Sequence, residues 1–173
     1  MGFQTAVQFN MGAGIPGEYA LDDRGARAEP GLLRSASAAN NVFGRVFTEL
    51  ATDPGVKRAG NPGGLGVRPA IMTSPKQNVS AGTAAGGTLA PTLVLRNEEI
   101  AEFTSSHAGI WVTTDSVARP GDIVRYLLTT GQIHVVPPGT ADDPLYADLP
   151  GAQVVRFPQP TVPGLCVVAI SAP

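Results

Sequence analysis

The chain has 173 residues, a formal net charge of −2 and 43% apolar residues, which suits one domain with enough material for a packed core. Its 12 Lys and Arg residues do not outnumber its 14 acidic ones, so we expect no nucleic-acid surface. No apolar run reaches the ~18 residues of a membrane span, so we expect no membrane contact. Only 15% of residues are charged, and 21 Gly with 16 Pro favour short strands and turns.

Residues 1–40 are predicted to form an extended N-terminal arm, followed by a folded body over residues 41–173. The stretch MGAGIPGEYALDDRGARAEPG (residues 11–31) contains five glycines and two prolines, and its apolar residues follow no period. Ordering such a segment costs about 1–2 kcal/mol per residue, so we expect a partner surface to order it. The apolar anchors that the arm offers are Ile15, Tyr19 and Leu21.

The first strands of the body are predicted from β-branched and aromatic residues. Residues 42–50 form one such strand, with Gly44 as a bulge, and two strong turn signals, Asp-Pro-Gly and Asn-Pro-Gly-Gly, follow it. Residues 65–72 form the next, in which Pro69 indicates an edge position or a bulge. Residues 73–87 are a long loop of small and polar side chains.

The second half of the chain carries the clearest strand patterns. Residues 88–96 and 98–106 are predicted strands, and residues 108–136 contain three short strands separated by tight turns, which predicts a β-meander. A proline-rich loop over residues 137–151 precedes two last strands at 153–157 and 164–171. Seven to nine short strands with little or no helix predict an all-β fold, a small β-barrel or a jelly-roll-like sandwich.

The residues that carry chemistry do not assemble into a recognisable active site. Cys166 lies in an apolar strand, where a thiol is inert, and as the only cysteine it excludes an intrachain disulfide. His107 and His134 have no second ligand at metal-binding spacing, which also disfavours a metal-dependent jelly-roll enzyme. Trp111 lies within a strand, which favours a core role over an exposed sugar-stacking one. We therefore expect no catalytic residue, no metal, no cofactor and no enzymatic activity.

Two motifs resemble those of the tailed-phage structural cement (capsid decoration) proteins. The segment GIPGEYALDDRGAR is similar to their opening PA-x-x-G-D-F-A-x-x-N-P-R, with matching residues Pro16, Gly17, Glu18, Tyr19, Ala20 and Arg24. The hairpin PGDIVRYLLTTGQI, from Pro120 to Ile133, is the best single match, and the resemblance covers most of the chain. The family's Asn-Pro-Arg is Asp-Asp-Arg here, and the loop over residues 137–151 has no counterpart.

The resemblance implies a virion protein that is assembled in the host cytoplasm and sits on the outer surface of an icosahedral capsid. There it would bridge major capsid protein subunits as a homodimer or homotrimer at a symmetry axis. The residues that we expect to contact the capsid protein are Ile15, Pro16, Gly17, Tyr19, Leu21, Arg24 and Arg27. The alternative is a receptor- or glycan-binding β-module of a phage tail or a host surface.

Overall fold

The computed structural model describes residues 14–73, 94–156 and 164–171. Over these residues the secondary structure consists of strands and two single-turn 3-10 helices, η1 (Ala38–Asn40) and η2 (Pro62–Gly64), which confirms the all-β class. None of the helices described is long or apolar enough to cross a membrane. The strands are β1 (Arg27–Leu33), β2 (Val46–Leu50), β3 (Asp53–Ala59), β4 (Gly66–Thr73), β5 (Ile100–Thr114), β6 (Ile123–Leu127), β7 (Ile133–Val136), β8 (Tyr146–Arg156) and β9 (Gly164–Ile170).

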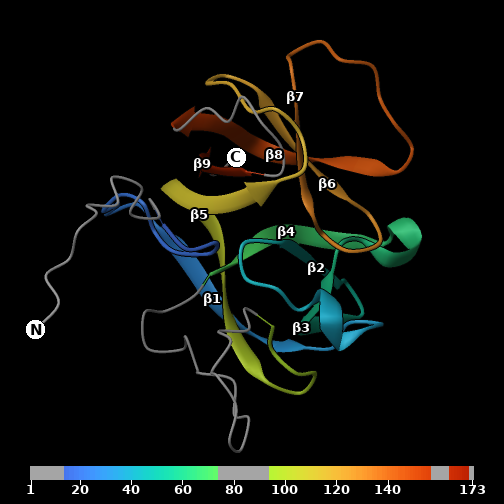
Figure 1. Cartoon of the computed structure of the whole chain (residues 1–173). Coiled ribbons are helices and arrows are strands. Elements are labelled where there is room, and N and C mark those ends of the chain that lie inside the picture. Colours follow the sequence, from blue (N-terminus) through green and yellow to red (C-terminus); the bar gives the residue numbers. More distant parts are fainter. Residues whose placement is uncertain (1–13, 74–93, 157–163, 172–173) are drawn as a thin grey trace, which may run out of the picture.

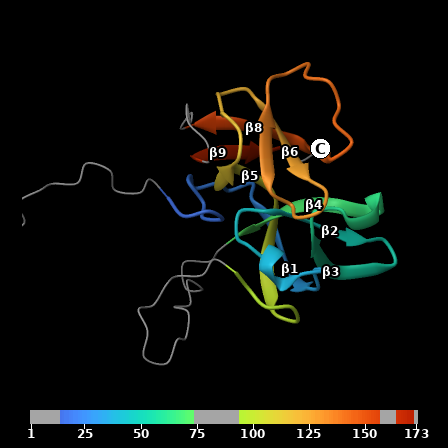
Figure 2. The ribbon, with the colours of Figure 1, turned by 45° about the vertical axis from the view of Figure 1, so that its right-hand side comes forward.

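The strands pair into two closed rings that share β5 (Figures 1 and 2). The first barrel has the order β1-β3-β2-β4-β5 and closes through β1–β5, and the second has the order β5-β7-β6-β8-β9 and closes through β5–β9. The 15 residues of β5 are enough for both: residues 100–106 pair with β1 and β4, and residues 107–114 pair with β9 and β7. Of the two architectures expected, the barrel describes these pairings.

Each barrel encloses its own apolar core. Leu33, Phe47, Met72 and Phe103 fill the first, and the Phe47 and Phe103 rings meet edge to face at 5.3 Å. The core of the second is built from β-branched and other apolar residues, among them Ile110, Val112, Val124, Ile133, Cys166 and Val168. Trp111 is 6% exposed and burial raises the pKa of the Cys166 thiol to about 12, so the core roles expected for both are confirmed.

A buried ion network lies in the wall of the first barrel. The Lys57 ammonium is fully buried, 2.8 Å from Glu29 Oε1 and 3.2 Å from Glu49 Oε2, and it lies 5.7 Å from the centre of the Phe103 ring. Burial acts to raise the pKa of Glu49, but a hydrogen bond from the Gly55 N–H and the charge of Lys57 outweigh it, so this pKa lies below its ordinary value. Glu49 therefore stays ionised inside the protein.

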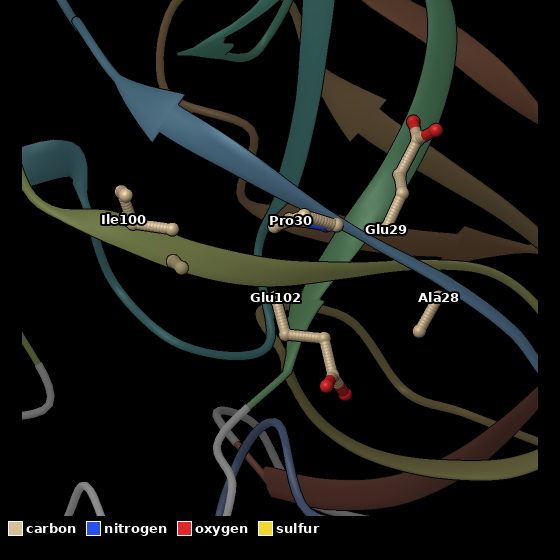
Figure 3. Close-up of a pocket in the computed structure, with 6 residues that line it drawn as sticks. Ala28, Glu29, Pro30, Ile100 and Glu102 are labelled. Atoms are coloured by element: carbon tan, nitrogen blue, oxygen red, sulfur yellow. The ribbon is translucent and has the colours of Figure 1, made fainter.

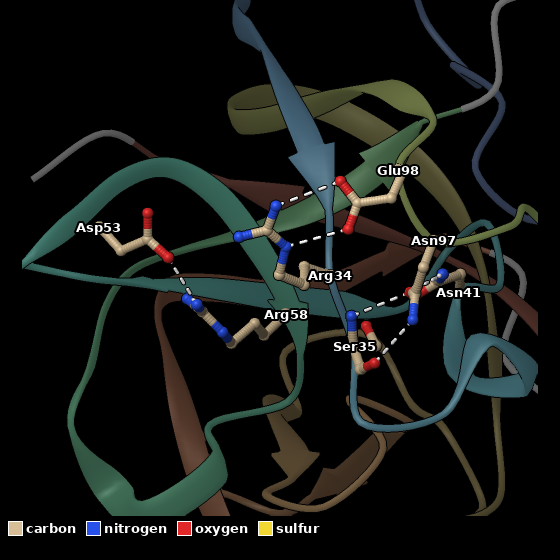
Figure 4. Close-up of polar contacts among 7 residues, drawn as sticks. All are labelled: Arg34, Ser35, Asn41, Asp53, Arg58, Asn97 and Glu98. Carbon is tan, nitrogen blue, oxygen red and sulfur yellow. Dashed lines mark hydrogen bonds and ion pairs between the residues drawn. The ribbon is translucent and has the colours of Figure 1, made fainter.

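A second polar cluster fastens the turn before β5 to the end of β1 (Figure 4). Arg34 donates from Nε and Nη2 to both carboxylate oxygens of Glu98, at 3.0 and 3.2 Å. Asn97 accepts from the Ser35 N–H and from the Asn41 side chain, and it donates back to the Ser35 carbonyl. These bonds hold the chain at the point where it enters the shared strand.

The barrels also touch at a second place, the β6–β7 turn. The Val46 N–H donates to the Gly131 carbonyl, and the Asn61 N–H donates to the Leu128 carbonyl, at 2.9 and 2.8 Å. Gly131 has a φ of 70°, and a Cβ there would overlap the carbonyl group of Val46. A glycine at this turn is therefore required both by its backbone conformation and by the close approach of the two barrels.

Several details of the predicted strands are wrong. Residues 108–136 do not form a meander, because β7 lies between β5 and β6, although β6 and β7 do form the predicted hairpin. Gly44 is not a strand bulge: it has a φ of 79° and lies in a turn that precedes β2. The strand predicted at 98–106 and the first strand of the predicted meander are one strand, β5.

Other elements differ in their bounds. The strand β8 begins at Tyr146, so the loop predicted to run to residue 151 ends earlier. Residues 27–33, assigned to the arm from the sequence, form β1 and complete the first barrel. Thr73, the first residue of the loop predicted at 73–87, ends β4, and the rest of that loop and most of the strand predicted at 88–96 lie outside the described residues. The bulge that Pro69 indicated is confirmed, because the β2–β4 register shifts there.

We expect Gly131→Ala to lower the free energy of unfolding by about 3 kcal/mol or more, because it adds steric overlap to an unfavourable φ. Gly139→Ala is the matched control: Gly139 also has a positive φ, 82°, but a Cβ there meets nothing within 4 Å. Its cost should be about 1–2 kcal/mol. Chemical denaturation measures the free energy of unfolding of each variant. If both variants lost the same amount of stability, the close contact between the barrels at Gly131 would be contradicted.

Candidate functional site

Residues 14–26, called the docked segment below, lie along β5 of the same chain. Three backbone hydrogen bonds of 2.7–2.9 Å join residues 17–20 to Gly109 and Trp111, and Tyr19 forms an isolated antiparallel bridge with Ile110. Because β9 pairs with the other edge of β5 at Ile110 and Trp111, the segment lies on the edge that β7 reaches at Thr114. The surface that orders this part of the arm is thus its own barrel.

Tyr19 anchors the docked segment to the first-barrel half of β5. Its hydroxyl donates to Glu102 Oε1 at 2.7 Å and lies 2.8 Å from Thr104 Oγ1. Its ring stacks on His107 with the centroids 4.2 Å apart and the planes 12° from parallel. Burial raises the pKa of Tyr19, so the phenol keeps its proton at neutral pH. The segment therefore acts as a strap, bonded to both halves of the shared strand.

His107 and Asp23 fix the end of the strap. His107 is buried, and its Nδ1 accepts the Gly109 N–H at 3.0 Å, which requires this nitrogen to carry no proton. Burial lowers the pKa of His107, and Asp23 partly opposes this shift. Asp23 accepts the N–H groups of Gly25 and Ala108, both at 2.7 Å, and these two bonds lower its pKa. Asp23 therefore closes the turn at the end of the docked segment and ties it to β5.

The seven residues expected to contact a partner fall into two groups. Pro16 and Gly17 pack against the Gly44 turn, where Gly17 is buried, and Leu21 is half-buried over Gly109. Ile15 is also half-buried, and Tyr19 is 40% exposed. The last two, Arg24 and Arg27, are exposed, and neither side chain pairs with an acidic group in the described ranges. The structure thus leaves the first five at least partly packed against the same chain, with Gly17, Tyr19 and Leu21 on β5, and leaves the two arginines facing solvent.

The sequence analysis did not identify the residues that bind Tyr19, which are Glu102, Thr104 and His107. Glu102 and Thr104 are two residues apart on β5, so they point to the same face of the strand, and this spacing was the available signal. His107 was singled out only as an isolated histidine. Its contact with Tyr19 spans more than eighty residues of sequence, which no local pattern reports.

A shallow hollow of about 240 Å³ lies along the paired strands β1 and β5 (Figure 3). Glu29 and Glu102 line it but point to opposite sides of the two strands, and each is already engaged, Glu29 with Lys57 and Glu102 with Tyr19. Ile100 at its rim is 70% exposed. In the part of the chain that the structure describes, no group of three or more His, Cys, Asp and Glu side chains is placed to hold a metal ion. The docked segment and the hollow beside β1 and β5 are therefore interpreted as surfaces for contact with another molecule.

The comparisons with known proteins agree with this architecture. A chain of a solved structure, "The capsid of Myoviridae Phage XM1", superimposes with a TM-score of 0.58 over 99% of this chain and 98% of that chain. At 14% identity this likeness shows a shared fold. No curated protein sequence matches the chain. The family model described as "Structural cement protein (E217 gp24/Pam3 gp6)" matches residues 3–171. The chain therefore belongs to the phage structural cement proteins, a family of capsid structural proteins.

Proposed function

We propose that this protein binds the outer surface of an icosahedral phage capsid, as a homodimer or homotrimer, and bridges neighbouring subunits of the major capsid protein. The family match over residues 3–171 is the observation that carries the proposal. Each copy need bury only about 800 Å² per partner to make a stable contact. Because binding selects the assembled shell over its separated subunits, many such contacts stabilise the shell by mass action.

The two-barrel architecture supports a bridging role. The barrels share β5, meet again at the β6–β7 turn and are strapped together by the docked segment, so their relative placement is fixed before binding. A preorganised body loses little conformational entropy when it binds, so more of the contact energy goes into holding the partners. We infer that each barrel rests on a different capsid protein subunit.

The contact surface that we propose is the outer side of the docked segment and the start of β1. Arg24 and Arg27 are exposed there, and the Tyr19 ring of the docked segment is partly exposed. An arginine guanidinium matches the geometry of a carboxylate and suits contacts between proteins. The glycan-binding alternative depended on aromatic residues exposed in a groove. Trp111 is buried, and one face of the partly exposed Tyr19 ring is stacked on His107.

We expect the double substitution Arg24→Glu/Arg27→Glu to weaken capsid binding by about 10- to 100-fold, because like charges replace the proposed ion pairs. The measurement is the occupancy of purified capsids that lack this protein, after the variant is added and the particles are sedimented. Arg119→Glu is the matched control, since Arg119 is also exposed but lies in the turn before β6. If the double variant bound like the control, the proposed surface would be wrong.

We also expect acid to loosen the strap. The folded-state pKa of His107 lies below its unfolded value of about 6.5, so its contribution to stability is present above that pH and is lost as the pH falls through the lowered pKa. Protonated Nδ1 no longer accepts the Gly109 N–H, although Asp22 and Asp23 attract the imidazolium.

Hydrogen-exchange protection of the Ala20 and Trp111 amides at about pH 7 and about pH 5 tests this expectation. Protection should fall on acidification in the native protein and stay constant in His107→Gln, because glutamine can accept the same N–H without titrating. The same decrease in both proteins would exclude His107 as its cause.

A further inference from the structure

Arg68 occupies a backbone position that normally requires glycine. Phe47 pairs with Ala70 and Glu49 with Val67, so two residues of β4, Arg68 and Pro69, lie opposite one residue of β2. This is a β-bulge, and Arg68 has a φ of 49°, in the left-handed region that glycine takes at the first position of such bulges. A following proline further restricts its predecessor to extended conformations. A bulky residue kept under this strain indicates that its side chain has a use.

The buried ion network holds the Arg68 side chain in place. Arg68 Nη1 lies 3.1 Å from Glu49 Oε1, and Glu49 is held in turn by Lys57 and by the Gly55 N–H. The Glu49 side chain is 4% exposed, whereas that of Arg68 is 69% exposed. The carboxylate is therefore fixed inside the barrel wall, and it presents the rest of the guanidinium to the outside.

This guanidinium borders a groove of about 390 Å³ where the two barrels meet. The groove is lined by Glu29, Arg68, Pro69 and Ser105 of the first barrel's strands and by Pro150 and Ile170 of the second's. Its surface is mostly apolar, with Arg68 and Glu29 supplying opposite charges. It also adjoins the contact surface proposed above, because the Ser105 hydroxyl donates to the Arg27 carbonyl at 3.5 Å.

We propose that this groove binds an extended segment of the major capsid protein, which presents a carboxylate to Arg68 and an apolar side chain to Pro69, Pro150 and Ile170. The proposal rests on the proposed capsid-binding function and names the site through which the junction of the barrels takes part in it. Continuity with the surface at Arg27 favours the capsid protein as occupant.

The bulge makes a sharp experiment possible, because Arg68→Gly removes the guanidinium and relieves the strain at once. We expect Arg68→Gly to keep the thermal midpoint of the native protein and to bind purified capsids at least about tenfold more weakly. Arg68→Glu should bind more weakly still, since it repels the incoming carboxylate. Arg119 provides the matched controls Arg119→Gly and Arg119→Glu, because it also precedes a proline and is exposed but lies away from the groove. Both controls should bind like the native protein.

The outcomes separate this inference from the proposed function. If the native protein does not bind capsids, the proposed function fails and the groove has no such partner. If the native protein binds and folded Arg68→Gly binds equally well, the function stands and the groove inference is overturned. If Arg68→Glu changes the oligomeric state in the absence of capsids, the occupant is a second copy of this chain, which also overturns the inference.

Discussion

Everything in this molecule depends on one strand that belongs to two barrels. Neither ring closes without β5, so the two apolar cores cannot form independently of each other. The docked segment and β1 run back along the same strand, and the ion network of the first barrel packs against its Phe103. We therefore expect the described body to unfold as a single cooperative unit, a property that would suit the proposed bridging role.

The sequence predicts the strands better than their partners. Alternation and turn residues located most strands of the second half, because these signals are local. The pairing of β7 with both β5 and β6 is set by ring closure, and the segment between residues 108 and 136 alone could not report it. For the same reason, one long strand was interpreted as two: His107 to Gly109 resemble a turn locally, but here they lie at a bulge inside β5.

The candidate site shows a different limit. The glycines near the N-terminus were interpreted as a sign that the segment has no structure of its own. In the structure, Gly14 and Gly17 lie so close to Trp111 and to the Gly44 turn that a larger side chain would not fit there. Composition cannot distinguish a glycine needed for flexibility from one needed for contact. The Arg68 network was equally out of reach from the sequence. Pro69 indicated the bulge, but Arg68 meets Glu49, and Lys57 meets Glu49 and Glu29, only after four strands have paired.

Ring closure has a consequence for solubility. Every described strand has a hydrogen-bonded neighbour on both sides, counting the pairings that close the rings. Open sheet edges are the usual templates for β-aggregation, and they are most dangerous where identical chains are crowded together. If the protein coats a capsid as proposed, its copies are crowded together on the shell. Two closed barrels then offer few strands to which a neighbouring copy could add.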